Sequence, residues 1–169
     1  KVTLPAEIAF RLDARFATAK AMSDGSWLVA LPTLKNGLTE QVNIYRFNGA
    51  KSDLSFGEKG VLHIPTSSIS AKVSFMNDGS FYLVKKTDLS HSSVCKFKKG
   101  GEADLKFGTT GCLHYSVFER QDDRASFITL MEGQADALFV AARVDDSNAE
   151  VSRLDRQGNL NADFGSEGT

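Results

Sequence analysis

Long apolar runs and an excess of either charge are both missing from this chain of 169 residues. No apolar run reaches the length that spans a bilayer, and the N-terminal residues do not show the basic-then-apolar pattern of a targeting segment. The 20 lysines and arginines balance 21 aspartates and glutamates, which leaves a net charge of -1. We therefore expect neither a nucleic-acid partner nor insertion into a membrane.

Catalytic and cofactor-binding patterns are missing as well. The sequence offers no convergent Ser, His and Asp set, no glycine-rich phosphate loop and no spaced pair of carboxylates. We predict from this a protein that is not an enzyme and that holds no cofactor or metal ion.

An internal repeat is the strongest feature that the chain does have. A Phe-Gly pair recurs at spacings of 51 and 57 residues, and another glycine follows each pair three residues later. A basic residue followed by a large apolar one precedes the glycine of each pair by 11 or 12 residues. A period of this order is typical of solenoids and propellers. The predicted repeats are 1–60 with Arg46, Phe56 and Gly57, 61–111 with Lys96, Phe107 and Gly108, and 112–168 with Arg153, Phe164 and Gly165.

Each unit predicts short antiparallel strands. Alternating residues before an Asp-Gly or Glu-Gly turn predict a first strand and a hairpin, because glycine accepts the positive φ of a tight turn. An almost wholly apolar second strand should be central, a third ends at the basic residue and its apolar neighbour, and a fourth follows each FGxxG. The expected strands lie near 16–22, 27–31, 42–47 and 61–65, near 73–76, 82–84, 94–97 and 112–116, and near 126–131, 138–142 and 151–154.

Four strands per unit without helical periodicity favour an all-β fold of β-propeller blades over a sandwich. In such blades the three Phe-Gly phenylalanines would fill the gap between neighbouring blades. The glycine after each would let the chain turn tightly against another backbone.

The order of these markers resembles the delta-60 β-propeller repeat of large bacterial surface and secreted proteins. The resemblance covers the whole chain and is closest in residues 151–168, "VSRLDRQGNLNADFGSEG". Lys96 in place of arginine, and a spacing one residue shorter between Arg46 and Gly57, depart from the pattern. The resemblance implies a propeller fold and a secreted or cell-surface location, and it brings no catalytic residues. Integrin-type and NHL repeats fit less well and would also be propellers.

Three units do not complete a ring of about four to eight blades, and the third unit lacks a fourth strand, which leaves an open edge. Residues 1–5, "KVTLP", align with the strands that begin at Val61 and Cys112. We expect the remaining blades to belong to a longer chain, of which this is an excised piece. The alternative is a six-bladed ring of two copies, in which residues 1–4 of one copy complete the last blade of the other.

Candidate ligand-binding residues are few. Trp27 could stack on a sugar ring, but its apolar neighbours favour core packing. His63 and His114 occupy the same position in two fourth strands, and we expect both to be solvent-exposed strand residues, because equivalent positions on neighbouring blades lie too far apart to share zinc. His91 belongs to a serine-rich turn.

Cys95 and Cys112 are the 2 cysteines, and they fall on the third and fourth strands of the second unit. A disulfide is possible if their Cα atoms approach within about 4.4–6.8 Å. Free buried thiols are favoured, because Tyr45 and Ser152 stand at the positions that match Cys95 in the other units.

The oxygen-rich stretches 144–150 and 159–163 fit calcium loops poorly, and the charged stretch 122–124 is expected to be a solvated loop.

These observations predict a rigid, non-catalytic scaffold outside the cytoplasm of a bacterium, with recognition or adhesion carried by loops at the ring faces. The ligand would be a protein or a surface. The alternative is a carbohydrate-binding, lectin-like propeller.

Overall fold

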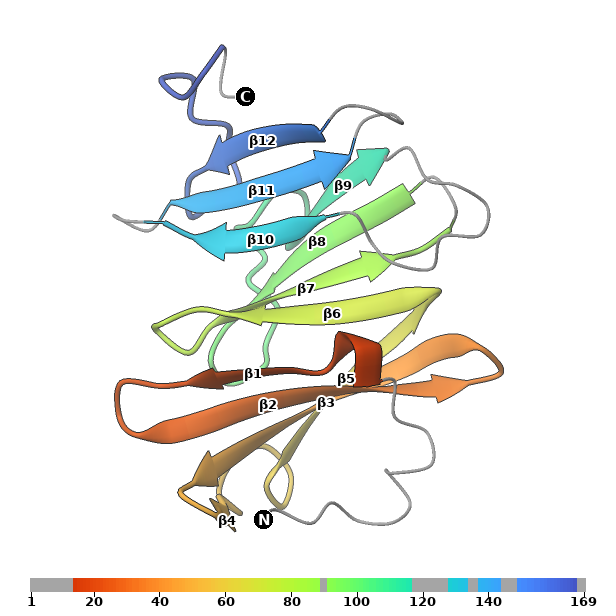
Figure 1. Cartoon of the computed structure of the whole chain (residues 1–169), viewed down its shortest axis with the longest axis vertical. Coiled ribbons are helices and arrows are strands. Elements are labelled where there is room, and N and C mark those ends of the chain that lie inside the picture. The colour runs from red at the N-terminus through yellow and green to blue at the C-terminus, as the bar shows by residue number, and fades with distance from the viewer. Residues whose placement is uncertain (1–13, 89–90, 117–127, 134–136, 144–148, 167–169) are drawn as a thin grey trace.

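The computed structural model describes residues 14–88, 91–116, 128–133, 137–143 and 149–166, and every structural statement below concerns these residues. They form twelve β-strands in three antiparallel sheets, with one short 3-10 helix, η1 (Ala14–Phe16), before the first strand. Figure 1 shows the sheets one above another in chain order. The all-β prediction is confirmed, whereas the described sheets form an open stack and no closed ring or barrel.

The strands are paired in chain order within each sheet. The first sheet contains β1 (Thr18–Ala21), β2 (Ser26–Lys35), β3 (Leu38–Asn48), β4 (Lys51–Ser52) and β5 (Val61–Ser68). The second contains β6 (Ser70–Phe75), β7 (Phe81–Lys86), β8 (His91–Phe97) and β9 (Cys112–Ser116). The third contains β10 (Thr129–Glu132), β11 (Leu138–Arg143) and β12 (Ala149–Leu154). Strands β2, β7 and β11 are central as expected, and in the first sheet β4 and β5 both pair with β3.

The Asp-Gly sequences form the tight hairpins that their glycines predict. Met22 N donates to Ser26 O at 2.8 Å and Gly25 N donates to Met22 O at 3.0 Å, while Gly25 has a φ of 81°. A type I turn closed by a left-handed glycine makes these two bonds. Met76 and Ser80 repeat the first bond at 2.9 Å in the second sheet.

The first two FGxxG sequences each make a close backbone approach and then a second hairpin. A Cβ on Gly57 would lie 2.3 Å from Val61 O, and one on Gly108 would lie 2.4 Å from Cys112 O. The last two residues of these two motifs, Lys59-Gly60 and Thr110-Gly111, all have positive φ. Positive φ at both central residues defines a type I′ turn, whose twist suits a two-residue hairpin. The closing glycine therefore sets the start of β5 and β9.

Two hydrophobic clusters hold the sheets face to face. In each strand alternate residues point to one side, so a sheet can bury apolar residues on both faces. Each fully buried side chain contributes roughly 1.5–3 kcal/mol. The first cluster contains Leu28, Ala30, Val42, Ile44 and Ile64 of the first sheet with Ala71, Val73, Phe75, Phe81 and Leu83 of the second. The second contains Met76, Tyr82, Val84, Val94 and Phe107 of the second sheet with Ile128, Leu130, Leu138, Val140 and Leu154.

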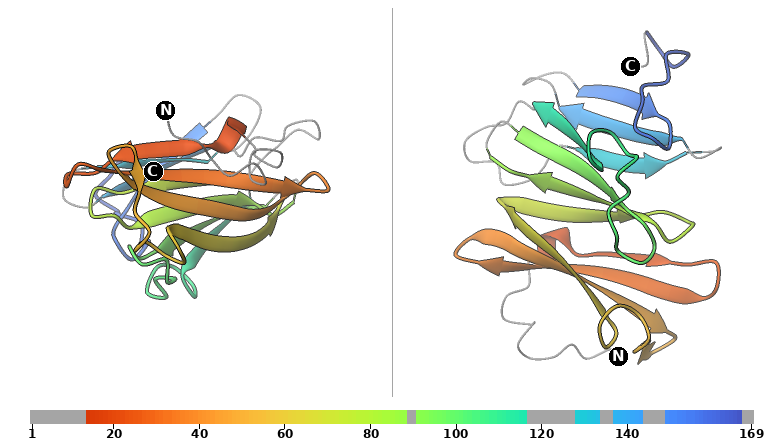
Figure 2. Two further views of the ribbon diagram at one scale, coloured as in Figure 1. Left: turned by 90° about the horizontal axis from the view of Figure 1, so that it is seen from below. Right: turned by 180° about the vertical axis from the view of Figure 1, so that it is seen from behind.

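The first strands of the three sheets, β1, β6 and β10, all form the same edge of their sheets. They lie one above another on the side facing the viewer in Figure 1, and the reverse view of Figure 2 shows β3, β5 and β9 on the other side. Two side chains of β1 bind the backbone of β6: Thr18 Oγ1 donates to Val73 O at 2.9 Å, and Lys20 Nζ donates to Phe75 O at 3.0 Å.

Candidate functional site

A carboxylate and a basic side chain meet at one end of the first sheet, where the β1–β2 turn lies. We call the end of the molecule that carries the β1–β2 and β6–β7 turns the hairpin-turn end. Ser26 donates to Asp24 Oδ1 through its backbone N at 2.9 Å and its Oγ at 2.6 Å. Arg46 Nη2 lies 2.6 Å from Asp24 Oδ2, and Arg46 Nε lies 3.8 Å from Asp53 Oδ2. The Ser26 hydrogen bonds, with a smaller contribution from Arg46, hold the pKa of Asp24 below its ordinary value, so the turn carries an ionised carboxylate.

The second sheet repeats this arrangement with a lysine. Lys96 Nζ lies 3.3 Å from Asp104 Oδ2 and donates to Arg156 O at 2.9 Å. The ammonium also lies 5.9 Å from the ring centres of both Tyr82 and Phe107, a cation–π distance. Lys96 thus connects the second sheet to the loop that follows β12.

A polar pocket opens beside Lys96, between the second and third sheets. Its charged and polar walls are Asp78, Ser80, Tyr82, Lys96, Glu132 and Arg156. Burial, reinforced by the charges of Asp78 and Asp104, raises the pKa of Tyr82, so its phenol stays neutral and can donate a hydrogen bond. Burial alone would raise the pKa of Asp78, but hydrogen bonds from Ser80 and the charges of Lys96 and Arg156 outweigh it and keep that pKa low. The pocket can hold a polar ligand between fixed charges of both signs.

One ion pair links the outer two sheets at the edge formed by β1, β6 and β10. Lys20 Nζ of the first sheet lies 3.0 Å from Glu132 Oε2 of the third. Asn77 N, after β6, donates to both oxygens of Glu132 at 3.1 Å. The three first strands therefore converge closely enough for one lysine to reach past the second sheet.

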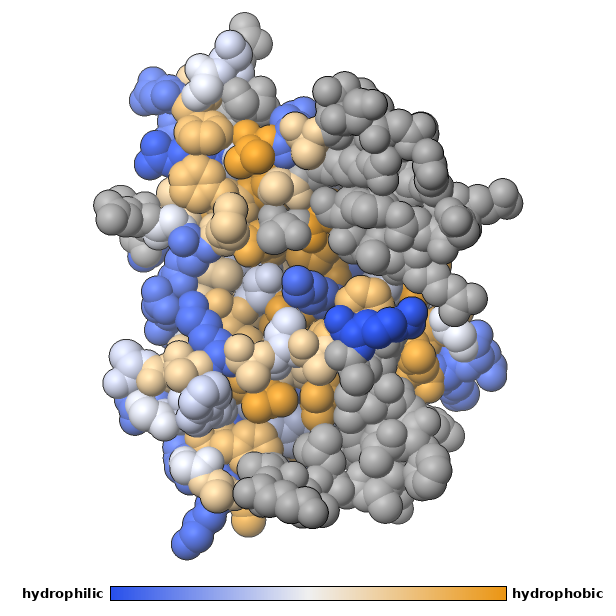
Figure 3. Space-filling model, viewed as in Figure 1, coloured by the Kyte–Doolittle hydropathy of each residue, from blue (hydrophilic) through white to orange (hydrophobic). Residues whose placement is uncertain are grey.

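Figure 3, seen from the side of β1, β6 and β10, shows hydrophilic residues along the margin where the β1–β2 and β6–β7 turns lie, with apolar residues next to them. The pocket between the first and second sheets is lined mainly by apolar side chains, with Asp24, Arg46 and Lys99 at its polar side. Among the described residues, charges and small pockets thus coincide at the hairpin-turn end.

The third sheet has the same backbone hydrogen bond between the loop and the basic residue, but its sequence lacks the aspartates that pair with that residue in the other sheets. Asn161 N donates to Arg153 O at 2.8 Å, as Asp53 N does to Arg46 O and Asp104 N to Lys96 O at 2.9 Å. Asn161 thus stands where the other sheets place an aspartate. Arg153 Nε is buried and has no hydrogen-bond partner among the described residues.

Two of the three Phe-Gly phenylalanines, Phe56 and Phe107, lie where the sheets meet. Phe107 is fully buried in the cluster between the second and third sheets, edge to face with Tyr82 at a centroid distance of 5.3 Å. Phe56 packs against the cluster between the first and second sheets. Phe164 contacts Phe139 in the same geometry at 5.5 Å, on the face of the third sheet turned away from the second.

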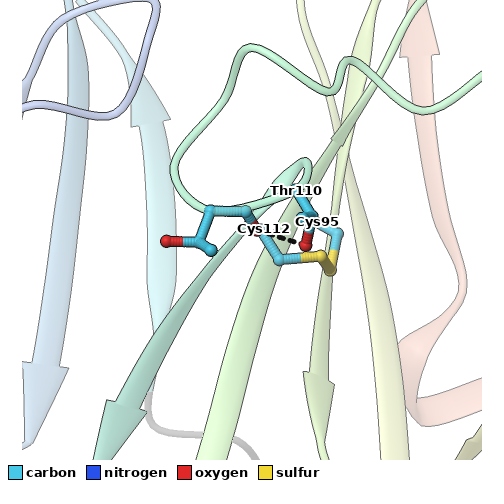
Figure 4. Close-up of a disulfide and its surroundings, with 4 residues drawn as sticks. Cys95, Thr110 and Cys112 are labelled. Atoms are coloured by element: carbon cyan, nitrogen blue, oxygen red, sulfur yellow. Dashed lines mark hydrogen bonds between the residues drawn. A yellow bond between two sulfur atoms is a disulfide. The ribbon is translucent and has the colours of Figure 1, made fainter.

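Cys95 and Cys112 form a disulfide, so the preference for free thiols was wrong (Figure 4). The two residues are directly opposite each other in β8 and β9, with Cα atoms 4.1 Å apart. Cys112 N bonds to Thr109 O rather than across the ladder, which marks a non-hydrogen-bonded pair, the closer of the two antiparallel pair types. At the same register of the first sheet Tyr45 faces Val61.

The candidate ligand-binding residues do not come together. Trp27 is 48 % exposed, so the preferred expectation of core packing is not met, while Phe81 at the matching position is 1 % exposed. His63 and His114 are both exposed, and His63 Nδ1 lies 2.7 Å from Asn43 Oδ1. His91 begins β8 rather than lying in a turn, and its Nδ1 lies 2.8 Å from Asp88 Oδ1.

In the oxygen-rich stretch 159–163, the side-chain oxygen of Asn161 is used within its own turn, where it accepts from Asp163 N at 3.1 Å. In the part of the chain that the structure describes, no three His, Cys, Asp or Glu side chains gather as a metal site. No helix there has the length and apolar character needed to cross a membrane. Residues 1–5, 122–124 and 144–148 lie outside the described residues.

Two groups of site residues were missed by sequence reasoning. The recurring "DGS" was interpreted only as a turn, although an aspartate followed two residues later by serine also predicts a capped, ionised carboxylate. Nothing in the sequence pairs Lys20 with Glu132, because that contact depends on how the sheets stack.

Searches of family models, curated proteins and solved structures find no significant match to the chain. The resemblance to the delta-60 repeat therefore rests on the sequence markers alone.

Proposed function

We propose that the chain is a segment of a β-propeller that works as a rigid, non-catalytic binding scaffold outside the cytoplasm of a bacterium. The observation that carries the proposal is the convergence of β1, β6 and β10, in which Lys20 of the first sheet reaches Glu132 of the third at 3.0 Å. Blades around a common axis bring their first strands together in this way. Face-to-face apolar clusters between successive sheets support the same arrangement.

The binding surface of this scaffold is the hairpin-turn end. Ionised Asp24 and Asp78, the paired Arg46 and Lys96, and the polar pocket between the second and third sheets all lie there. The Cys95–Cys112 disulfide supports an extracytoplasmic location, because disulfides persist in oxidising compartments. The remaining blades belong to a longer chain or, as the alternative, to a second copy.

Beads displaying the chain, applied to arrays of extracellular proteins and of glycans, test the binding function. We expect retention on protein spots that weakens with Lys99→Glu, because Lys99 lines the pocket at the hairpin-turn end. Lys35→Glu is the matched control, since Lys35 ends β2 at the opposite end. Binding that responds equally to both variants would contradict a site at the hairpin-turn end, and retention on neither array would contradict the scaffold function.

A carbohydrate-binding propeller is the second candidate, and the exposed ring of Trp27 favours it. On the same arrays this function requires retention on glycan spots that Trp27→Ala abolishes.

Light scattering of the chain in solution separates the two sources of the missing blades. A monomer supports a longer chain, and a dimer supports a ring of two copies.

A further inference from the structure

In the first and second sheets, the basic residue at the position that matches Arg153 forms ion pairs with aspartate side chains. Its counterpart Arg46 contacts Asp24 and Asp53 in the first sheet, at 2.6 and 3.8 Å. Its counterpart Lys96 contacts Asp104 in the second sheet at 3.3 Å. Side-chain carboxylates are therefore the ligands that this part of the fold selects.

The carboxylates come from two positions of the repeat, that of Asp24 and Asp78 and that of Asp53 and Asp104, and the third unit has other residues at both. Asn161 occupies the position of Asp53 and Asp104, because its backbone N makes the same bond to the basic residue. Gly133 N donates to Ala137 O as Met76 N does to Ser80 O. In the sequence, an alanine stands two residues after Gly133, whereas Asp78 stands two residues after Met76. The third unit therefore keeps the basic residue, Arg153, and its sequence has no acid at either of these two positions.

The cavity at Arg153 has room and charge for such a group. Its lining includes Arg153, Arg156, Asn161 and Asp155. Asp155 is occupied by its own turn, since its oxygens accept from Gln157 N at 2.8 Å and from Asn159 N and Nδ2 at 2.9 Å. Arg153 Nε is buried without a partner among the described residues, a state that costs roughly 1–3 kcal/mol for an ordinary polar group and more for a charged one.

We propose that this cavity binds the carboxylate of an aspartate or glutamate side chain of a partner protein, held by the Arg153 guanidinium. A guanidinium presents parallel N–H donors that match the two oxygens of a carboxylate. The internal counterparts of the ligand are protein side chains, which favours an acidic protein segment over an acidic sugar. The site deepens the binding function proposed above by naming the chemistry of its partner.

Arginine Nε–Hε signals of the ¹⁵N-labelled chain, followed by NMR at constant ionic strength, test the site. We expect sodium acetate to shift one signal saturably, and Arg153→Lys, which lacks that group, identifies it. N-acetyl-Ala-Asp-Ala-amide should shift the same signal at several-fold lower concentration, while the Asn peptide should not. Asn161→Asp supplies the missing internal carboxylate and should weaken acetate binding at least tenfold. Asp163→Asn, in the same loop, should leave it unchanged.

Several results would overturn the proposal. A flat acetate titration, or an unchanged response in Asn161→Asp, removes the site. Glucuronate that saturates the signal at lower concentration than the Asp peptide makes the occupant an acidic sugar, and a response to acetate but not to the peptide makes it a free carboxylate. Retention on the protein array with a flat titration would refute this site while leaving the scaffold function standing.

Discussion

Residues 96–108 of the second sheet and 153–165 of the third follow the same backbone path in different surroundings. Phe107 and Phe164 both lie edge to face with an aromatic partner. The backbone carbonyls of Lys96 and Arg153 both accept a hydrogen bond from a backbone N–H of the loop. In the second sheet, however, Gly108 N donates to Gln157 O of the third sheet at 2.7 Å, Phe107 is fully buried, and Lys96 has its aspartate. The backbone of the motif is thus set locally, while its side-chain interactions depend on the neighbouring sheet.

The largest test of this comparison is truncation of the two phenylalanines. Phe107→Ala should cost about 3–5 kcal/mol of unfolding free energy, because it empties a fully buried site. Phe164→Ala should cost about 1–2 kcal/mol, since Phe164 is half-buried. Chemical denaturation measures both. Leu105→Ala, at 69 % exposure, is the control and should change stability by less than about 0.5 kcal/mol. Equal losses for the two phenylalanines would show that the third sheet adds nothing to the packing of Phe107.

Sequence reasoning predicted the strands and their order because local rules decide them. Gly25 and Gly79 allow the positive φ of their turns, and the apolar runs that follow become the central strands β2 and β7. The glycine after each phenylalanine was also correctly linked to a close backbone approach, at Val61 and Cys112. The two-residue strand β4 was not predicted, because Lys51 and Ser52 carry no apolar alternation.

Contacts that depend on strand register or on how the sheets stack could not be predicted from the sequence. A slip of one residue would have placed Cys95 and Cys112 on opposite faces of the second sheet, so a disulfide could not be decided without the type I′ turn at Thr110 and Gly111 that fixes the register. The Lys20–Glu132 pair joins residues 112 positions apart, and no local pattern links them.

The disulfide gives a second test, because it belongs to the second sheet alone. It closes a loop with a sequence separation of 17, for which the chain-entropy model gives about 3 kcal/mol. Replacing Cys95 and Cys112 together by serine should lower the unfolding free energy by about that amount. Reductant should act on the wild-type chain and have no effect on the double variant. A double variant as stable as the oxidised wild type would mean that strand pairing alone holds β8 to β9.

A smaller effect separates two glycines that both have positive φ. Gly108→Ala should cost about 2–3 kcal/mol, because it combines left-handed strain with a Cβ only 2.4 Å from Cys112 O. Gly37 has a φ of 79°, and a Cβ added there would have no atom within 4 Å. Gly37→Ala should therefore cost only the left-handed strain of about 1–2 kcal/mol. Thermal unfolding of the two variants measures the difference. Equal destabilisation would show that the backbone at Cys112 can yield to the added methyl group.

The smallest expected effect is the pH dependence of stability that Asp78 contributes. The third unit has Ala135 at the matching position in sequence and so lacks this carboxylate. The Ser80 hydrogen bonds and the charges of Lys96 and Arg156 outweigh burial and lower the pKa of Asp78 in the folded chain. A lowered folded pKa contributes stability above the ordinary pKa of 3.8, and this contribution disappears as the pH falls through the folded pKa. Asp78→Asn should therefore lose about 1 kcal/mol at neutral pH and show a shallower decline on acidification, measured by denaturant titrations between about pH 7 and 2. Asp163→Asn, on an exposed loop, is the control. An acid profile in Asp78→Asn parallel to that of the wild type would mean that the Ser80 turn does not favour the ionised carboxylate.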